Sequence, residues 1–384
     1  MGKLGRRALL IGAGTLVAVG AGGHWLTRKK NIPLGFKISS TELDEARLFL
    51  REHQAIDAHA HPGRTFAVGA ENLPVKLELM KWLLAGGEDR PVQAMREGGM
   101  SAVAFAGVSD FQVLDLVGGT PTNVRDFERG EAWASYQRQI GNMKALVERG
   151  LVKQILKTAD FATVHASGDV GAFWTMEGGD FLEGKPERVA QAYADGLRSI
   201  ALLHYRNNEL GDITTGKPRN IGLTAQGEAV VAACNDAGML IDVAHASDQT
   251  AKGILKSTRH PVMASHVHIN SEHFRHPRFI SLDLGRMVAN QGGGVLGAWP
   301  AGLGISSLDG FVTRTKELMS MVGTDHVCFG SDIDANYKPV FDDYHYLPHY
   351  VARLLQSKVP PSDVVKVIGG NFLRIFGAVE AGKK

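Results

Sequence analysis

Short apolar runs alternate with amphipathic segments along the chain from about residue 40 onward. The apolar runs are rich in Val, Ile and Leu and are bounded by Gly, Pro and polar residues, a pattern that predicts buried β-strands. Between them, residues 41–53, 123–150 and 186–200 have apolar positions at helical spacing. The eight predicted strands cover residues 54–59, 100–108, 172–177, 200–205, 239–245, 261–266, 293–300 and 326–332.

Eight strand–helix units in roughly 330 residues predict one (β/α)8 barrel of the TIM type with insertions. The active site of such a barrel forms at the carboxyl ends of its strands. The alternative is an open, doubly wound sheet, but no Gly-rich dinucleotide-binding loop follows the first predicted strand. We therefore expect residues 31–384 to form a barrel domain, preceded by a separate segment at residues 1–30.

That N-terminal segment has the pattern of an export signal. Basic residues, including the adjacent pair Arg6 and Arg7, precede an apolar run of small residues at 8–23, and more basic residues follow at 28–30. The arginine pair resembles a twin-arginine signal. The segment is either cleaved, with residues 19–21 as a cleavage site, or retained as a membrane anchor. Both alternatives predict an exported protein, periplasmic or membrane-anchored, facing the outside of the cytoplasm.

Overall charge and cysteine content exclude several classes of protein. The net charge of +2 and the lack of a basic stripe interleaved with aromatic residues argue against a nucleic-acid partner. The two cysteines, Cys234 and Cys328, lie in separate apolar segments. We expect both to be buried thiols, with neither a disulfide framework nor a cysteine-type zinc site.

Polar side chains recur where the predicted strands end. A single histidine in such a place is ordinarily a hydrogen-bonded core residue, but five of them with two carboxylates are hard to explain by packing alone. Buried polar groups cost free energy unless they are paired, and a metal ion supplies that pairing. The residues at the predicted strand ends are His59, His61, Glu177, His204, His245, His266 and Asp332.

The number of candidate ligands indicates two metal ions rather than one. His59 and His61 are two residues apart, so a strand points both to the same face. A tetrahedral catalytic zinc needs only three protein ligands, whereas four of these five histidines, together with Glu177, are candidate ligands. A carboxylate can bridge two ions about 3.5 to 4 Å apart. We assign that bridge to Glu177, because Gly178 and Gly179 let the chain turn sharply beside it.

Several stretches, in the same order, resemble the membrane dipeptidase (renal dipeptidase) family of the amidohydrolase superfamily. The resemblance extends from about residue 55 to residue 376. The stretches that carry it are EGGDFLEG, IGLTAQGEAVVAACNDAGMLIDVAHAS, PVMASHVHINSEHFRHPRFI, HVCFGSDID and GGNFLRIF.

The resemblance implies a (β/α)8 metallo-dipeptidase with two divalent ions, most often zinc, that share a hydroxide nucleophile. It implies His204 as a substrate-binding residue, Asp332 as the catalytic acid and base, and Arg278 as the group that binds the substrate carboxylate. Arg275 is the alternative to Arg278, because the spacing from the last histidine ligand is one residue longer than in the family. The implied metal ligands are His59, His61, Glu177, His245 and His266.

The chain departs from the family pattern in two places. His61 stands where the family has an aspartate ligand, so the site carries one less negative charge. The loop after the fourth strand, LLHYRNNELGDI, also lacks the sequence motif that is usual in the family. We expect Asp57 to orient the first strand by hydrogen bonds rather than to bind metal, and we prefer Asp332 to Asp334 as the proton shuttle.

Three functions therefore remain open. The first is a metallo-dipeptidase that acts on a small peptide. The second is a related amidohydrolase that acts on N-acyl amino acids, lactones or phosphoesters. The third is a catalytically silent binding protein of the cell envelope. Whether the chain forms a homodimer is left open at this point.

Overall fold

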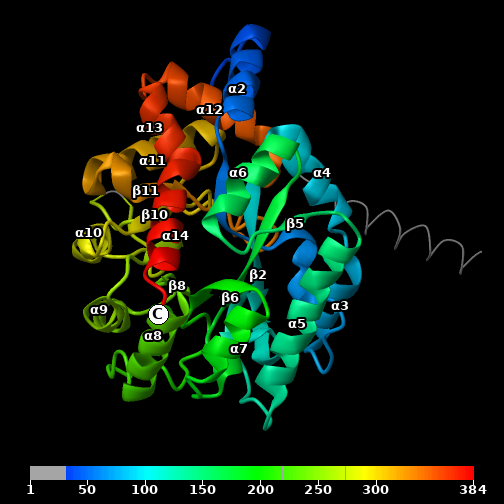
Figure 1. Ribbon diagram of the computed structural model, residues 1–384, viewed down its shortest axis with the longest axis vertical. Helices are drawn as coiled ribbons and strands as arrows, with labels where there is room; N and C mark the ends of the chain where they lie inside the picture. Colours follow the sequence, from blue (N-terminus) through cyan, green and yellow to red (C-terminus); the bar gives the residue numbers. More distant parts are fainter. Residues whose placement is uncertain (1–31, 218, 273) are drawn as a thin grey trace, which may run out of the picture.

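Eight parallel strands close into a barrel with helices around its outside (Figure 1). The computed structural model describes residues 32–217, 219–272 and 274–384; the predicted export segment lies outside them. The strands follow one another in the order β2-β1-β11-β10-β9-β8-β7-β6, and pairing of β2 with β6 closes the circle. The predicted (β/α)8 barrel is therefore confirmed. Its strands are β1 (Ile56–Ala60), β2 (Ala102–Val108), β6 (Gly171–Glu177), β7 (Leu197–Ala201), β8 (Leu240–Asp242), β9 (Met263–Val267), β10 (Val295–Ala298) and β11 (Val327–Phe329).

The helices begin and end at local signals in the sequence. Ser39, for example, caps α2 (Ser40–Glu52) in a capping box: its hydroxyl accepts from the Glu42 N–H at 3.2 Å, and the Glu42 carboxylate accepts from the Ser39 N–H at 2.8 Å.

Within the described residues we find no helix with the length and apolar character needed to cross a membrane. The helices are α2 (Ser40–Glu52), α3 (Val75–Leu84), α4 (Asp89–Gly98), α5 (Glu131–Glu148), α6 (Thr158–Ser167), α7 (Arg188–Ala194), α8 (Ala225–Ala237), α9 (Asp248–Ser257), α10 (Leu282–Asn290), α11 (Leu308–Val322), α12 (Leu347–Gln356), α13 (Pro361–Val365) and α14 (Asn371–Ala381).

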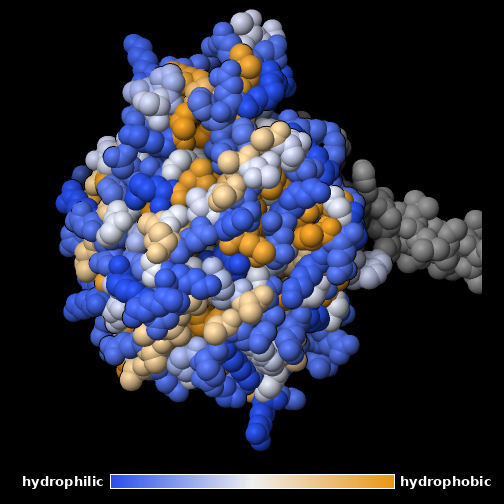
Figure 2. Space-filling view, viewed as in Figure 1, coloured by the Kyte–Doolittle hydropathy of each residue, from blue (hydrophilic) through white to orange (hydrophobic). Residues whose placement is uncertain are grey.

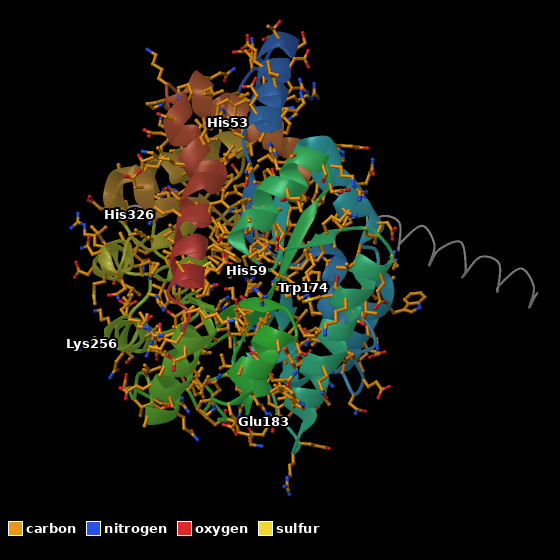
Figure 3. The ribbon with its side chains drawn as sticks, viewed as in Figure 1. His53, His59, Trp174, Glu183, Lys256 and His326 are labelled. Carbon is orange, nitrogen blue, oxygen red and sulfur yellow. The ribbon has the colours of Figure 1, made fainter. Side chains whose placement is uncertain are left out.

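The interior of the barrel is apolar at one end and polar at the other. Alternate residues of β6, namely Phe173, Thr175 and Glu177, share one face of the strand. Phe173 stacks on Phe372 of α14 with ring centroids 5.1 Å apart, in an apolar cluster that closes the amino end of the barrel. The inward face of β6 thus ends in a carboxylate at the carboxyl end of the barrel. Figure 3 shows His59, from β1, near the centre of the molecule.

The fourth barrel strand differs from its prediction. β7 begins at Leu197 rather than at residue 200, and α7 ends at Ala194 although helical spacing continues to residue 200. Gly196 has a φ of 109°, a conformation open mainly to glycine, and it separates the helix from the strand. The C-terminal part of the predicted helix is therefore wrong, and His204 lies in the loop after β7.

Two further boundaries are also corrected. β8 ends at Asp242, and His245 has a φ of 66°, a left-handed value that no strand residue adopts, so it lies in the following turn. Helix α5 begins at Glu131 rather than at residue 123, because Gly130 precedes it with a φ of 81°. The carboxyl end of the barrel consequently takes more of its residues from loops than the apolar pattern predicts.

Two insertions cover part of that end of the barrel. After β1 the chain forms the 3-10 helix η1 (Pro62–Ala67) and α3, and after β2 it forms η2 (Phe111–Val113) and the antiparallel hairpin of β3 (Leu114–Val117) and β4 (Thr120–Asn123). Their apolar side chains form a cluster separate from the main core.

The face of the molecule in Figure 2 is mostly hydrophilic with scattered apolar groups. Both cysteines are buried free thiols, as predicted.

Candidate metal centre

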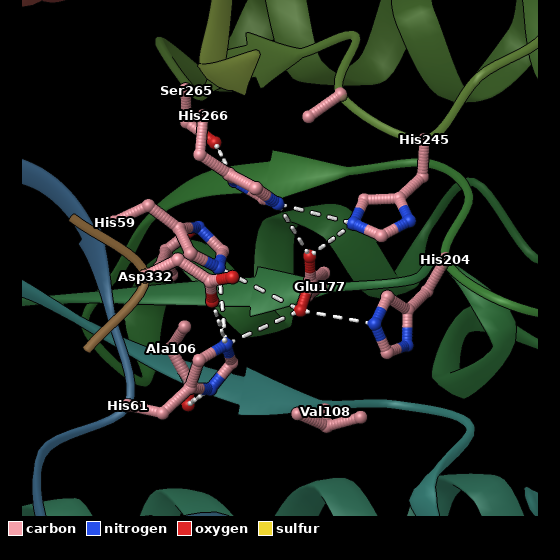
Figure 4. A network of polar contacts seen from close by, with 12 residues as sticks. His59, His61, Ala106, Val108, Glu177, His204, His245, Ser265, His266 and Asp332 are labelled. Carbon is pink, nitrogen blue, oxygen red and sulfur yellow. Dashed lines mark hydrogen bonds and ion pairs between the residues drawn. The ribbon is translucent and has the colours of Figure 1, made fainter. Parts of the chain in front are cut away.

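Glu177 lies at the centre of a ring of histidines at the carboxyl end of the barrel (Figure 4). The structure brings together all seven side chains predicted at the strand ends, and each is at most 7% exposed. The Glu177 Oε2 atom lies 3.2 Å from Nε2 of His204, 3.4 Å from Nε2 of His61 and 3.6 Å from Nε2 of His59, while Oε1 lies 2.9 Å from Nε2 of His245 and 3.5 Å from Nε2 of His266.

The ligand atoms form groups compact enough to hold metal ions. One group contains His59, His61 and Asp332, and another contains Glu177, His245 and His266. A third combines His59 and His266 with Asp242, a residue that the sequence reasoning missed. Asp242 is the last residue of β8, and its Oδ2 atom is buried without a hydrogen-bond partner. Its place at the end of an apolar strand, LID, was the signal that could have identified it.

The hydrogen-bond contact of His61 indicates how its ring is oriented toward a metal ion. The Nδ1 atom of His61 lies 3.1 Å from the Ala106 carbonyl oxygen, which can only accept, so Nδ1 carries the proton. In the neutral ring, Nε2 then points a lone pair at the Glu177 carboxylate, 3.4 Å away. Two electron-rich atoms facing each other in a buried site repel unless a cation lies between them. The site therefore has the arrangement that a divalent cation requires.

The electrostatic environment favours neutral imidazoles in one half of the site. Burial, assisted by the nearby Arg278, holds the pKa values of His245 and His266 well below the ordinary range. Neutral imidazole is the form that binds a metal. On the other side of Glu177, burial opposes charging of His59, but the carboxylate raises its pKa to about 9. A metal ion that binds there has to displace this proton.

Asp57 supports the first strand instead of pointing into the metal cluster. Its Oδ1 accepts from the backbone N–H of His59 at 3.1 Å and of Ser331 at 2.9 Å, and its Oδ2 accepts from the Tyr344 hydroxyl at 2.9 Å. Burial raises the pKa of Asp57 to about 6. It is in none of the candidate metal groups among the described residues. These bonds tie β1 to the loop after β11, which carries Asp332.

Asp332 and Asp334 point to different places although they are two residues apart. The Asp332 Oδ1 atom lies 3.5 Å from Nε2 of His61, and its Oδ2 accepts from the Trp299 indole N–H at 3.3 Å. Asp334 instead accepts from the Gly63 N–H at 2.8 Å and lies 3.6 Å from the Arg64 guanidinium. Asp332 has a φ of 54°, a strained value for a non-glycine residue. The structure thus places Asp332 in the cluster and Asp334 beside it.

His204 is oriented by Asp110, a second residue that the sequence reasoning missed. The Nδ1 atom of His204 lies 2.6 Å from Oδ1 of Asp110, whose Oδ2 accepts from the Tyr205 N–H at 2.9 Å. Burial opposes a charge on His204, but Asp110 and Glu177 on its two sides raise its pKa. Asp110 lies in a turn after β2, where nothing in the local pattern distinguishes it from a surface aspartate.

Arg278, not Arg275, reaches the cluster. Arg278 is 3% exposed, and its NH2 atom lies 2.9 Å from Nε2 of His266. Its Nε and NH1 atoms are buried without a hydrogen-bond partner. The guanidinium carbon lies 5.3 Å from the centroid of the Trp299 ring. Arg275 is exposed. A buried guanidinium with free donors beside a metal-ligand cluster is a binding group for an anion.

Comparison with known proteins identifies the family of this barrel. Residues 43–384 match the model of the membrane dipeptidase family, peptidase family M19. The chain belongs to the membrane dipeptidase family. Dipeptidase aclJ of Aspergillus oryzae is 31% identical to it over 225 residues, which are 56% of this chain and 53% of that protein. The match therefore spans about half the length of that relative.

Solved structures of similar fold include two further proteins of bacterial origin. The crystal structure of the probable dipeptidase PvdM from Pseudomonas aeruginosa has a TM-score of 0.75 and 17% identity, and the similarity covers 90% of this chain and all 100% of that one. A metallopeptidase from Rhodobacter sphaeroides, bound to a phosphinate mimic of the dipeptide L-Ala-D-Ala, has a TM-score of 0.69 and 20% identity, with 85% and 99% coverage. At these identities the likeness supports the barrel fold of this family member.

Proposed function

We propose that this member of the membrane dipeptidase family is a metal-dependent hydrolase that cleaves the amide bond of dipeptides. The observation that carries the proposal is the position of Glu177 between two ligand groups, with Arg278 buried beside one of them. A metal site alone fits many hydrolases. A metal site with a fixed guanidinium at its edge fits a short substrate that ends in a free carboxylate.

The proposed cofactor is a pair of divalent ions, with zinc as the metal that histidine-rich sites favour. His59 and His61 would hold one ion, His245 and His266 the other, and Glu177 would contact both. When bound, the ions polarise the substrate carbonyl and lower the pKa of a water molecule from about 15.7 toward neutrality. The two carboxylate oxygens of Glu177 support this assignment, because Oε2 lies 3.4 Å from Nε2 of His61 and Oε1 lies 2.9 Å from Nε2 of His245.

Asp332 and His204 are the residues that we propose to act on the reacting groups. The Asp332 carboxylate would take the proton of the attacking water and pass it to the leaving amine. Burial raises the pKa of Asp332, although His61 and His59 oppose that shift, and this favours a group that both accepts and returns a proton. His204, held between Asp110 and Glu177, would donate from Nε2 to the developing oxyanion.

Arg278 would bind the substrate carboxylate through the N–H groups that lack partners in the protein. Its guanidinium rests near the Trp299 ring and cannot move outward without losing that contact. A carboxylate held there would fix the carboxyl end of the substrate beside the metal-ligand cluster. The proposal therefore favours dipeptides over longer peptides and over dipeptides whose carboxyl end is an amide.

A second candidate function rests on the departure at His61. A histidine in place of the aspartate ligand of the family removes one negative charge from the site. That change favours a related amidohydrolase that acts on N-acyl amino acids, lactones or phosphoesters. A catalytically silent envelope protein is the least supported alternative, because Glu177 and Asp332 both point into the cluster.

A substrate screen with metal analysis tests the proposed function. We expect purified protein to contain about two divalent ions per chain and to hydrolyse dipeptides. The screen should compare L,L with L,D dipeptides, and each dipeptide with its carboxyl-terminal amide. It should also include lactones and N-acyl amino acids. Cleavage of free dipeptides but not of their amides supports the role of Arg278. Hydrolysis of lactones or N-acyl amino acids alone supports the second candidate, and absence of bound metal supports a silent protein.

We also propose that the protein is exported by the twin-arginine route. Changing both Arg6 and Arg7 to lysine should leave the protein in the cytoplasm, because the arginine pair is the recognised feature of such signals. Cell fractionation with an antibody against the chain measures the outcome, and the reverse substitution, of Lys29 and Lys30 to arginine, is the control. Unchanged delivery of the Arg6 and Arg7 variant points instead to another export route or a simple anchor.

A further inference from the structure

The cavity above Glu177 has two chemically different halves. It has a volume of about 300 Å³. One half is the metal-ligand cluster with Arg278. The other half, which we name the apolar lobe, is lined by Phe66, Leu77, Met80, Phe111, Leu114 and Pro121.

The apolar lobe is built by the two insertions, not by the barrel. Phe66 comes from η1, Leu77 and Met80 from α3, and Phe111 from η2. The rings of Phe66 and Phe111 pack edge to face with centroids 4.9 Å apart, and Leu114 is buried against them at the start of the hairpin. Because these side chains pack on one another, the lobe is a formed wall and not a loose surface.

The charged groups at the edge of the lobe have partners within the protein. Asp334 is paired with Arg64 and with the Gly63 N–H, and the Asp115 carboxylate accepts from the Leu116 N–H at 2.7 Å. A charged substrate group placed in the lobe would lose water and meet mainly apolar atoms. An apolar group placed there would be stabilised by burial.

The lobe and Arg278 lie on opposite sides of Glu177. Arg278 contacts His266, whereas Phe66 of the lobe packs on His61 with ring centroids 5.3 Å apart. Figure 4 shows His61 and Val108 on one side of Glu177, and His266 on the other. A substrate with its carboxylate at Arg278 and its amide over Glu177 therefore directs its carbonyl-side group into the lobe.

We propose that the apolar lobe makes the protein selective for substrates with a large apolar group on the carbonyl side of the scissile amide. That group is either the side chain of a hydrophobic amino-terminal residue or an acyl chain, since both present the same apolar surface. The inference rests on the proposed function for the position of the amide, and it adds the class of substrate.

Kinetics with the intact wild-type protein test the selectivity directly. Leu-Ala is compared with Gly-Ala, and N-hexanoyl-alanine with N-acetyl-alanine, so that each pair differs only in the size of the apolar group. Burial of a leucine-sized group corresponds to about a tenfold to hundredfold gain in kcat/KM for the larger member of a pair. A gain only in the dipeptide pair identifies a side chain as the natural occupant, and a gain only in the acyl pair identifies an acyl chain.

Two neighbouring residues of α3 give a matched test of the lobe. Met80 faces the lobe, whereas Leu79 is 54% exposed on the outer face of the helix. Met80→Glu should reduce the preference for Leu-Ala over Gly-Ala at least tenfold, while Leu79→Glu should keep both the activity and the preference. Leu116, on the hairpin, also lines the cavity and packs against the apolar cluster of the lobe, so Leu116→Glu is a second variant that should act as Met80→Glu does. Metal content and circular dichroism check that each variant is folded.

The outcomes separate this inference from the proposed function. Equal kcat/KM values within both wild-type pairs, or a preference that Met80→Glu and Leu116→Glu leave intact, overturn the role of the lobe while dipeptidase activity stands. Cleavage of N-hexanoyl-alanine in preference to N-acetyl-alanine, without any cleavage of dipeptides, overturns the proposed function but supports the lobe. No hydrolysis of any of the four substrates overturns both.

Discussion

Glu177→Gln is expected to remove both metal ions from the protein, not one. The two carboxylate oxygens face different histidines: Oε2 lies 3.4 Å from His61 and Oε1 lies 2.9 Å from His245. An amide has one oxygen and one N–H₂ group, so it cannot present a negatively charged oxygen to both sides. Metal content measured by mass spectrometry should fall from about two ions per chain to nearly none, and hydrolysis should be lost with it.

The loop after β6 provides a matched control for this change. Glu183 lies six residues further on, and its carboxylate is paired with Arg188 at 3.0 Å instead of with the histidines. Glu183→Gln should therefore keep the full metal content. Retention of two ions by Glu177→Gln at wild-type affinity would exclude Glu177 as the bridge. Retention of one ion would assign Glu177 to a single metal.

Asp332→Asn is expected to abolish most of the activity while metal stays bound. The amide is nearly the same size as the carboxylate and can still accept the hydrogen bond from Trp299, but it cannot take up a proton. Proton transfer by a positioned side chain is typically worth about 10² to 10⁴ in rate. We expect kcat to fall by about that factor, with little change in KM for a dipeptide held by Arg278.

Asp334→Asn is the control, because it makes the same chemical change two residues away. Asp334 is held by Gly63 and Arg64, so its variant should lower kcat by less than about tenfold. A different pattern is expected if Asp332 is a metal ligand, which its position in one group with His59 and His61 allows. If Asp332→Asn loses metal but keeps normal turnover per bound ion, Asp332 is a metal ligand. Asp334 or His204 would then be the better candidate for the proton shuttle.

The local pattern of the sequence was sufficient for the architecture and for the types of residue at the site. A buried strand needs a short run of apolar residues, and this requirement concerns only the residues of the strand itself. The eight runs therefore predicted the eight strands of the barrel. Because parallel strands of a barrel place their carboxyl ends at the same edge, the sequence also predicts that Glu177 and the histidines lie close together.

Only the tertiary structure decided between residues of the same type. Arg278 and Arg275, or Asp332 and Asp334, look alike to any local rule, and they differ in what the rest of the chain places around them. Arg278 contacts His266 and lies near the Trp299 ring, whereas Asp334 is held outside the cluster by its contacts with Gly63 and Arg64.

The sequence by itself determined the barrel and the end of it at which the seven predicted polar side chains gather, because apolar periodicity and side-chain chemistry are local properties. The tertiary structure decided the exact strand ends, the partner of His204 and the shape of the substrate cavity. Asp110 reaches His204 across 94 positions of the chain, and the apolar lobe joins residues from two separate insertions. Contacts of that kind depend on how distant segments pack, and no short stretch of sequence encodes them.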